Sequence, residues 1–151
     1  MSADKLASMS GLEAMRGVID GRFPAPPITK LMRFALTKVE RGLAVFEALP
    51  TLDYYNPLGS VHGGVIATLL DSALGCSIHT TLEAGQGYIT LEFKVSFIKA
   101  ITENTGPLRA EGRVLNVGRR SGTAEARLTD AQRRLLAHAT TTCLVFDVPK
   151  Q

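Results

Sequence analysis

Hydrophobic and polar residues alternate most regularly between residues 89 and 97. Five apolar residues occupy every second position, with polar residues between them: Ile89, Leu91, Phe93, Val95 and Phe97. A period of two is typical of a β-strand that turns one face toward a core. We therefore expect a strand here, with its apolar face packed against the interior.

The longest helical candidate spans residues 63–82. Nearly every residue in it is apolar or small, which predicts a helix buried on most sides instead of a surface helix with one polar face. Its only charged residue is Asp71. A buried helix of this length is expected to lie at the centre of the domain.

The remaining pattern predicts two further groups of elements. Period-two segments with turn residues between them indicate strands at 34–39, 43–49, 108–117, 123–129 and 135–146. Apolar residues at helical spacing indicate a short helix over 11–20, which ends at Gly21 and the prolines after it, with another turn over 28–33. The order of elements predicts an α+β domain in which a curved antiparallel sheet wraps one long helix.

Length and composition narrow the class of protein. A chain of 151 residues with 45% hydrophobic content suits one domain over 1–151, with an N-terminal helical extension over about 1–33. There is no secretion signal and no apolar run long enough to cross a bilayer, so we expect a cytoplasmic protein. The absence of Trp and the modest net charge of +3 argue against nucleic-acid binding.

The two cysteines, Cys76 and Cys143, lie in apolar segments without the spacing of metal ligands. We expect buried reduced thiols and neither a metal site nor a redox cofactor. Seven of the 17 basic residues fall between Arg109 and Arg134. This local bias fits either an anionic ligand or a set of solvated strand faces.

Asp71 is the anomaly of the central helix, because an unpaired buried carboxylate costs several kcal/mol. It must therefore be hydrogen-bonded, neutralised or placed at a wet cleft. One interpretation is a structural carboxylate satisfied by nearby donors. The other is a catalytic base or nucleophile, a role that suits a perturbed carboxylate in a cleft.

The segment before the helix contains His62, Gly63 and Gly64. Paired glycines leave backbone N–H groups accessible at the positive end of the helix, where they can stabilise an oxyanion. The alternative explanation of the glycines is close packing or a turn. Asp71 lies eight residues beyond Gly63, about 12 Å along the helix axis at 1.5 Å per residue. A dimer with two such helices packed antiparallel brings the helix start of one subunit opposite the middle of the other.

These residues resemble the hotdog thioesterases of the phenylacetate-pathway type. The similarity rests on the run from Asn56 to Gly64 with Asp71 nine residues after the histidine, and it continues through 85–88 and 116–120. The resemblance implies an acyl-CoA thioesterase in which Gly63 N–H polarises the thioester carbonyl and Asp71 of the partner subunit activates water or attacks directly. It also implies a homo-oligomer, with a tetramer of two dimers as the family expectation.

Other roles follow from the same resemblance. Asn56 helps to fix the carbonyl or the water, and His62 supports the loop and the helix start. Thr90 either orients the water or is an ordinary strand residue. Gly64 and Ser72 are expected to contact the substrate.

Arg119 and Arg120 are expected to bind the phosphates of coenzyme A, unless they only form a solvated turn. Three acyl classes stay open: aryl-acetyl, hydroxybenzoyl and medium-chain. Two other functions stay open as well, an acyl-CoA hydratase or dehydratase of the same fold and a binding module without catalysis.

Overall fold

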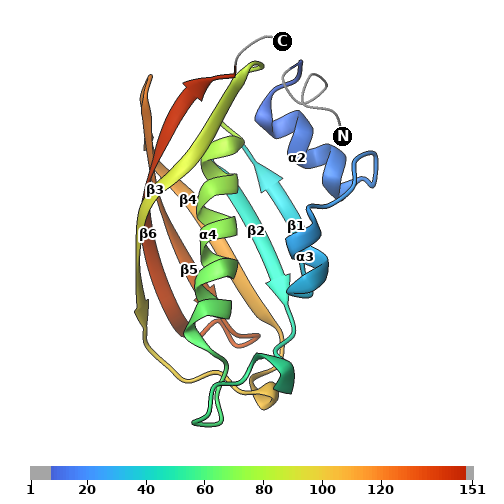
Figure 1. Ribbon diagram of the computed structural model, residues 1–151, viewed down its shortest axis with the longest axis vertical. Helices are drawn as coiled ribbons and strands as arrows, with labels where there is room; N and C mark the ends of the chain where they lie inside the picture. The colour runs from blue at the N-terminus through green and yellow to red at the C-terminus, as the bar shows by residue number, and fades with distance from the viewer. Residues whose placement is uncertain (1–7, 149–151) are drawn as a thin grey trace.

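The computed structural model describes residues 8–148, and within them a six-stranded antiparallel sheet curves around one long helix, α4 (Gly63–His79) (Figure 1). The strands lie in the order β1-β2-β4-β5-β6-β3. Their bounds are β1 Phe34–Glu40, β2 Leu43–Ala48, β3 Gln86–Phe97, β4 Leu108–Val117, β5 Ser121–Thr129 and β6 Leu135–Asp147. The predicted α+β architecture, with a curved sheet wrapped around a central helix, is confirmed.

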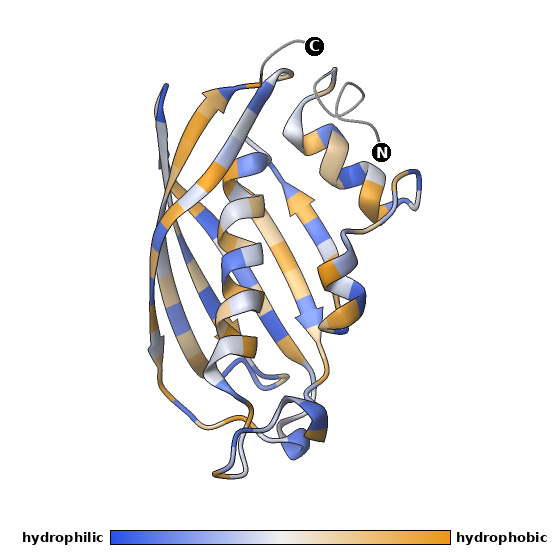
Figure 2. Cartoon of the chain, in the orientation of Figure 1, coloured by the Kyte–Doolittle hydropathy of each residue, from blue (hydrophilic) through white to orange (hydrophobic). Residues whose placement is uncertain are grey.

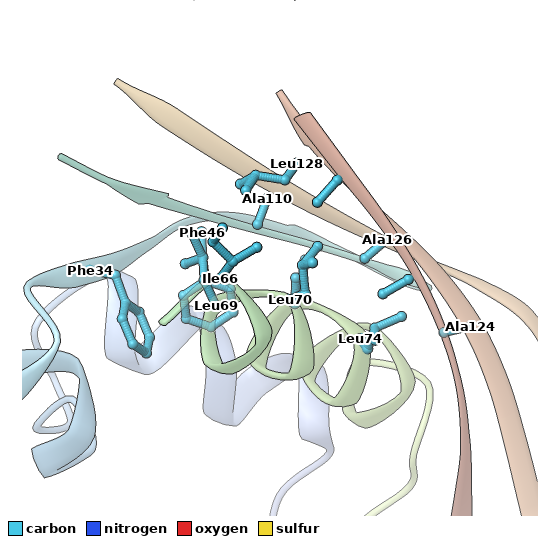
Figure 3. Packing of buried hydrophobic residues seen from close by; sticks show 14 of the residues in the cluster. Phe34, Phe46, Ile66, Leu69, Leu70, Leu74, Ala110, Ala124, Ala126 and Leu128 are labelled. Carbon is cyan, nitrogen blue, oxygen red and sulfur yellow. The ribbon is translucent and has the colours of Figure 1, made fainter. Parts of the chain in front are cut away.

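Small residues on the strands allow α4 to lie close to the sheet. Ala110, Ala124 and Ala126 are fully buried under the helix and face leucines such as Leu70 and Leu74 (Figure 3). At Gly112 of β4 the approach is closer still, because a Cβ atom there would lie 2.1 Å from the carbonyl oxygen of Ala73. Any larger residue at this position would push the helix away from the sheet.

α4 is buried on one side only. Its sheet-facing residues are fully buried, but the opposite side, which includes Gly64, Thr68, Asp71 and Ser72, is partly accessible. The expectation of a helix buried on most sides is therefore wrong for the single chain. The helix also ends at His79, with Thr80 as its C-cap, three residues before the predicted end.

Two helices lie within the predicted N-terminal extension, α2 (Gly11–Ile19) and α3 (Pro27–Leu31). Ser10 begins α2 through a capping box with Glu13. Both helices pack along the β1 edge of the sheet (Figure 1). Short 3-10 turns at Leu52–Tyr54 and Glu103–Thr105 complete the description, and within residues 8–148 no helix is long and apolar enough to cross a membrane.

The opposite edge strand, β3, corrects an expectation. Its apolar residues were expected to face a core, yet Ile89, Leu91 and Phe97 are 56%, 60% and 55% exposed. The strand carries hydrophobic segments along an edge that no other described element covers (Figure 2). The alternation predicted the strand correctly, but no other element within residues 8–148 supplies the surface that its exposed apolar residues require.

Candidate active site

Asp71 and Thr90 meet where the middle of α4 faces β3. The Thr90 hydroxyl donates a hydrogen bond to Asp71 Oδ1 at 3.1 Å. Burial raises the pKa of the Asp71 carboxyl above its ordinary value, and the hydrogen bond from Thr90 acts in the opposite direction. The structure thus places Thr90 beside Asp71, and its role in orienting water stays a prediction.

A cavity of about 450 Å³ opens beside this pair. Asp71, Ser72 and Thr90 contribute polar atoms to one wall, whereas most of the lining is apolar and comes from α2, α3, β1 and β2. Ser72 donates its hydroxyl to the carbonyl of Thr68 at 2.9 Å, so its own hydrogen is already engaged. Asp71 is the one charged residue of this lining.

Sequence reasoning missed two residues of the same cavity, Cys76 and Tyr88. Burial raises the pKa of the Cys76 thiol to about 12 and places the pKa of the Tyr88 phenol well above its ordinary value, so both stay neutral. Gly75 makes room for Tyr88, since a Cβ atom at Gly75 would lie 2.6 Å from the ring. A glycine inside a helix, four residues after Asp71, was the available signal for a close contact there.

The second cluster lies at the start of α4. His62 is the N-cap, and its Nδ1 accepts the N–H of Gly64 at 2.9 Å. This bond requires the tautomer with its proton on Nε2. The Gly64 N–H thus already has a partner, whereas no residue within 8–148 accepts the N–H of Gly63. Gly63 is therefore the donor available to an incoming ligand, and His62 supports the helix start, as expected.

Asn56 organises the loop that leads to this helix end. Its Oδ1 accepts the backbone N–H of Leu58 at 2.9 Å and of Ser60 at 3.3 Å, and its Nδ2 donates to Ser60 Oγ at 3.1 Å. Asn56 and Gly63 share a small pocket of about 300 Å³ with Phe97, whose ring lies against Gly63. One amide hydrogen of Asn56 remains for a ligand.

Arg119 and Arg120 lie exposed in the turn between β4 and β5. This turn is near the C-terminal end of α4, because Gly122 at the start of β5 packs against Ile78 of the helix. Neither arginine lines the Asp71 cavity or the Gly63 pocket. Within one chain they are separate from both clusters.

Three of the other five basic residues of the 109–134 segment form ion pairs, which fits the interpretation of solvated strand faces. Arg109 and Arg113 both pair with Glu111, and Arg134 pairs with Asp130. Among residues 8–148, no group of three or more His, Cys, Asp or Glu side chains is placed to hold a metal ion. Cys143 is buried as expected, whereas Cys76 is only partly so.

The predicted site residues thus form two clusters in one chain. Asp71, Thr90 and Ser72 meet at the large cavity, and Gly63 and Asn56 meet at the small pocket. Eight residues of helix separate Asp71 from Gly63, which is about 12 Å of axial rise. One chain cannot direct both groups at a single carbon atom.

Comparison with known proteins identifies the family. A family model described as the thioesterase superfamily matches residues 58–137, more than half of the chain. A Saccharolobus solfataricus protein provisionally named an esterase is 30% identical over 115 residues, which are 76% of this chain and 80% of that protein. The 1,4-dihydroxy-2-naphthoyl-CoA hydrolase of Listeria monocytogenes is 25% identical over 101 residues, 67% of this chain and 80% of the relative.

Among solved structures, a Ralstonia eutropha protein provisionally named a thioesterase, and described as related to phenylacetic acid degradation, superposes with a TM-score of 0.78. It is 26% identical and covers 86% of this chain and 98% of its own. The resemblance to the hotdog thioesterases of the phenylacetate-pathway type is confirmed. The chain belongs to the thioesterase superfamily, has the hotdog fold, and is a thioester hydrolase.

Proposed function

We propose that the protein is an acyl-CoA thioesterase whose active site is shared between two subunits. Asp71 of one subunit acts on the thioester, and the N–H of Gly63 of the partner subunit polarises its carbonyl. The observation that carries the proposal is the Asp71 carboxylate itself, which Thr90 holds at the wall of an apolar cavity of about 450 Å³. The relative from Listeria is named as the hydrolase of an aromatic acyl-CoA, which supports this class of substrate.

In the proposed reaction the Asp71 carboxylate removes a proton from water as the oxygen attacks the thioester carbon. The carbonyl oxygen becomes negative and accepts the Gly63 N–H, an interaction that strengthens as charge develops. The carbon–sulfur bond then breaks, and the proton held by Asp71 passes to the departing CoA thiolate. Protein groups and water suffice for this sequence, so we propose no metal or redox cofactor.

Direct attack by Asp71 is the second route, and it forms a mixed anhydride that water later hydrolyses. Single-turnover hydrolysis in ¹⁸O-labelled water detects an anhydride that opens at the Asp71 carbonyl, because the product then receives unlabelled oxygen from Asp71 and the label stays in the protein. Label found only in the acid product fits attack by water on the thioester or on the acyl carbon of the anhydride.

The helix geometry and the free edge of the sheet both favour a dimer. The exposed apolar residues of β3 need a cover, and the accessible side of α4 is next to that strand. Two copies joined along β3, with their α4 helices antiparallel, place the Gly63 end of one helix beside Asp71 of the other. A tetramer built from two such dimers stays a prediction.

The same arrangement suggests where coenzyme A binds. The β4–β5 turn lies near the C-terminal end of α4, and the start of an antiparallel partner helix beside Asp71 points toward that end. Arg119 and Arg120 would then lie near the Gly63 end of the partner subunit's helix and contact the phosphates of CoA. Aromatic and medium-chain acyl groups are the proposed substrates, and Gly64 and Ser72 remain the expected contacts.

The test is steady-state hydrolysis of phenylacetyl-CoA and several aliphatic acyl-CoAs by the wild type and by Asp71→Asn. The variant should lose at least about 10²-fold in kcat, the range expected for a positioned acid–base group. Asp20→Asn, which alters an exposed carboxylate on α2's C-cap, is the matched control and should keep full activity. Binding of acyl-CoA without turnover by the wild type would favour a binding module, and hydration of an enoyl-CoA would favour a hydratase.

The thermal stability of Asp71→Asn shows whether its loss of activity comes from lost chemistry or from lost folding. Because the pKa of Asp71 is raised in the folded state, the carboxyl favours folding in its protonated form and loses that contribution as pH rises through the folded pKa. At pH 7 the asparagine variant should therefore melt at the same temperature as the wild type or above it. A lower Tm together with lost activity would mean that Asp71 is a structural residue.

A further inference from the structure

We propose that the N-terminal helices α2 and α3 form the selective wall of the acyl site, and that this site accepts uncharged apolar acyl groups and rejects those that end in a carboxylate. The proposal rests on the function proposed above, since it assigns the Asp71 cavity to the acyl group. Two independent observations carry it: which elements line the cavity and which charges the lining contains.

The cavity lies between α4 and the N-terminal helices. Met15, Val18 and Ile19 of α2 and Ile28 of α3 line one side, across from Asp71 on α4. Figure 1 shows both short helices alongside β1, on the same face of the sheet as α4. A volume of about 450 Å³ falls in the range of roughly 300–1,000 Å³ that is typical of sites for small molecules. The space is therefore large enough for an acyl group, and α2 limits its extent.

This wall is held in place at both ends of α2. The backbone N–H of Gly11 donates to the carbonyl of Leu82, beyond the end of α4, at 3.0 Å. At the other end the Phe23 ring packs under Gly17, where a Cβ atom would lie 2.3 Å from the ring. The backbone N–H of Phe23 also donates to the carbonyl of Gly17 at 2.9 Å. A wall fixed in this way can discriminate by size, because a larger ligand cannot simply displace it.

The charges of the lining exclude a second carboxylate. None of the lining residues carries a positive charge, and Asp71 supplies the only negative one. Cys76 and Tyr88 stay neutral, because burial raises the pKa of both groups. An acyl group that ends in a carboxylate would lose its hydration without a counter-ion and would also repel Asp71.

The first experiment varies the size of the wall. Val18→Phe fills part of the cavity and Met15→Ala enlarges it, whereas Arg16→Ala changes an exposed residue of the same helix that is outside the lining. Val18→Phe should lower the ratio of kcat/KM for decanoyl-CoA over butanoyl-CoA at least about 10-fold. One methylene that no longer fits a hydrophobic pocket has an effect of roughly this size. Met15→Ala should raise that ratio, and Arg16→Ala should leave it unchanged. Circular dichroism and Tm establish that each variant is folded.

The second experiment varies charge and keeps length constant. Wild-type protein should hydrolyse hexanoyl-CoA with a kcat/KM at least about 10²-fold above that for adipoyl-CoA, which has the same six carbons and a terminal carboxylate. Ile28→Arg places a flexible cation at the partly exposed rim and should reduce this preference at least about 10-fold. Leu31→Arg, on the same helix but outside the lining, should not change it.

The outcomes separate this inference from the proposed function. If the wild type hydrolyses none of these acyl-CoAs, the proposed function is wrong. If it hydrolyses them but the decanoyl-to-butanoyl ratio is the same in Val18→Phe, Met15→Ala and Arg16→Ala, the N-terminal helices do not select the acyl group. Equal hydrolysis of adipoyl-CoA and hexanoyl-CoA by the wild type would overturn the assignment of charge selectivity.

Discussion

The two halves of α4 differ in what they offer to a thioester. The middle of the helix holds Asp71, a half-buried carboxylate with a hydrogen-bonding partner and a large apolar cavity beside it. The start of the helix holds Gly63, an uncharged position beside a small pocket, and no residue of the described range 8–148 accepts its N–H. In the proposed mechanism the first cluster supplies the base and the second supplies the oxyanion donor. Each is then half of a hydrolytic site.

The two edges of the sheet also differ, because other elements cover one of them more than the other. The β1 edge is packed against α2 and α3, whereas the apolar β3 edge lies uncovered next to the accessible side of α4. A helix is too rigid to bring its own two clusters together, but in the proposed dimer a second copy joined at β3 supplies the missing half. The incomplete site and the uncovered edge thus have a common explanation.

The largest expected effect comes from removing the Gly63 N–H without changing the helix. Gly63 is the first residue of α4, where proline fits well, and His62 before it has φ −60° and ψ 135°, a conformation that proline allows. Gly63→Pro should lower kcat about 10²- to 10³-fold, the effect of losing one oxyanion donor. Steady-state kinetics with phenylacetyl-CoA at saturating concentration measure this effect.

Gly63→Ala is the matched control. Either substitution adds a Cβ atom near the Phe97 ring, about 3.1 Å from its nearest atom, but alanine keeps the N–H. The alanine variant should therefore retain most of the activity that proline removes. Equal losses in both variants would mean that contact with Phe97 matters and that the donor does not.

The next effect tests whether the two halves come from different subunits. Asp71→Asn and Gly63→Pro are each expected to be inactive, but a dimer that contains one of each has one intact site. Random exchange of subunits makes about half of the dimers mixed, so activity should return to about a quarter of the wild-type value. The measurement is activity after co-refolding an equimolar mixture. Activity that stays at the level of the separate variants would place base and donor in the same chain.

The sequence predicted the elements and singled out the candidate site residues because both depend on local signals. Alternation revealed β3, and the isolated charge among apolar residues singled out Asp71. The orientation of β3 could not be predicted, because a period of two shows that one face is apolar but does not reveal whether the same chain covers it. The contributions of Cys76 and Tyr88 depend on how α4 and β3 pack, and neither residue has a local pattern that indicates a cavity.

The smallest predicted effect concerns Thr90 on β3, which donates a hydrogen bond to the carboxylate of Asp71 on α4. Its hydrogen bond lowers the pKa of Asp71, whereas burial raises it, so Thr90→Val should raise this pKa further. A general base works in its deprotonated form, and the acidic limb of the kcat/KM profile should therefore shift to higher pH in the variant. On the alkaline side of both limbs, where Asp71 is ionised in both proteins, the activities should converge to within about 10-fold. A uniform loss at every pH, with no displacement of the limb, would mean that Thr90 positions water or substrate and does not tune the carboxylate.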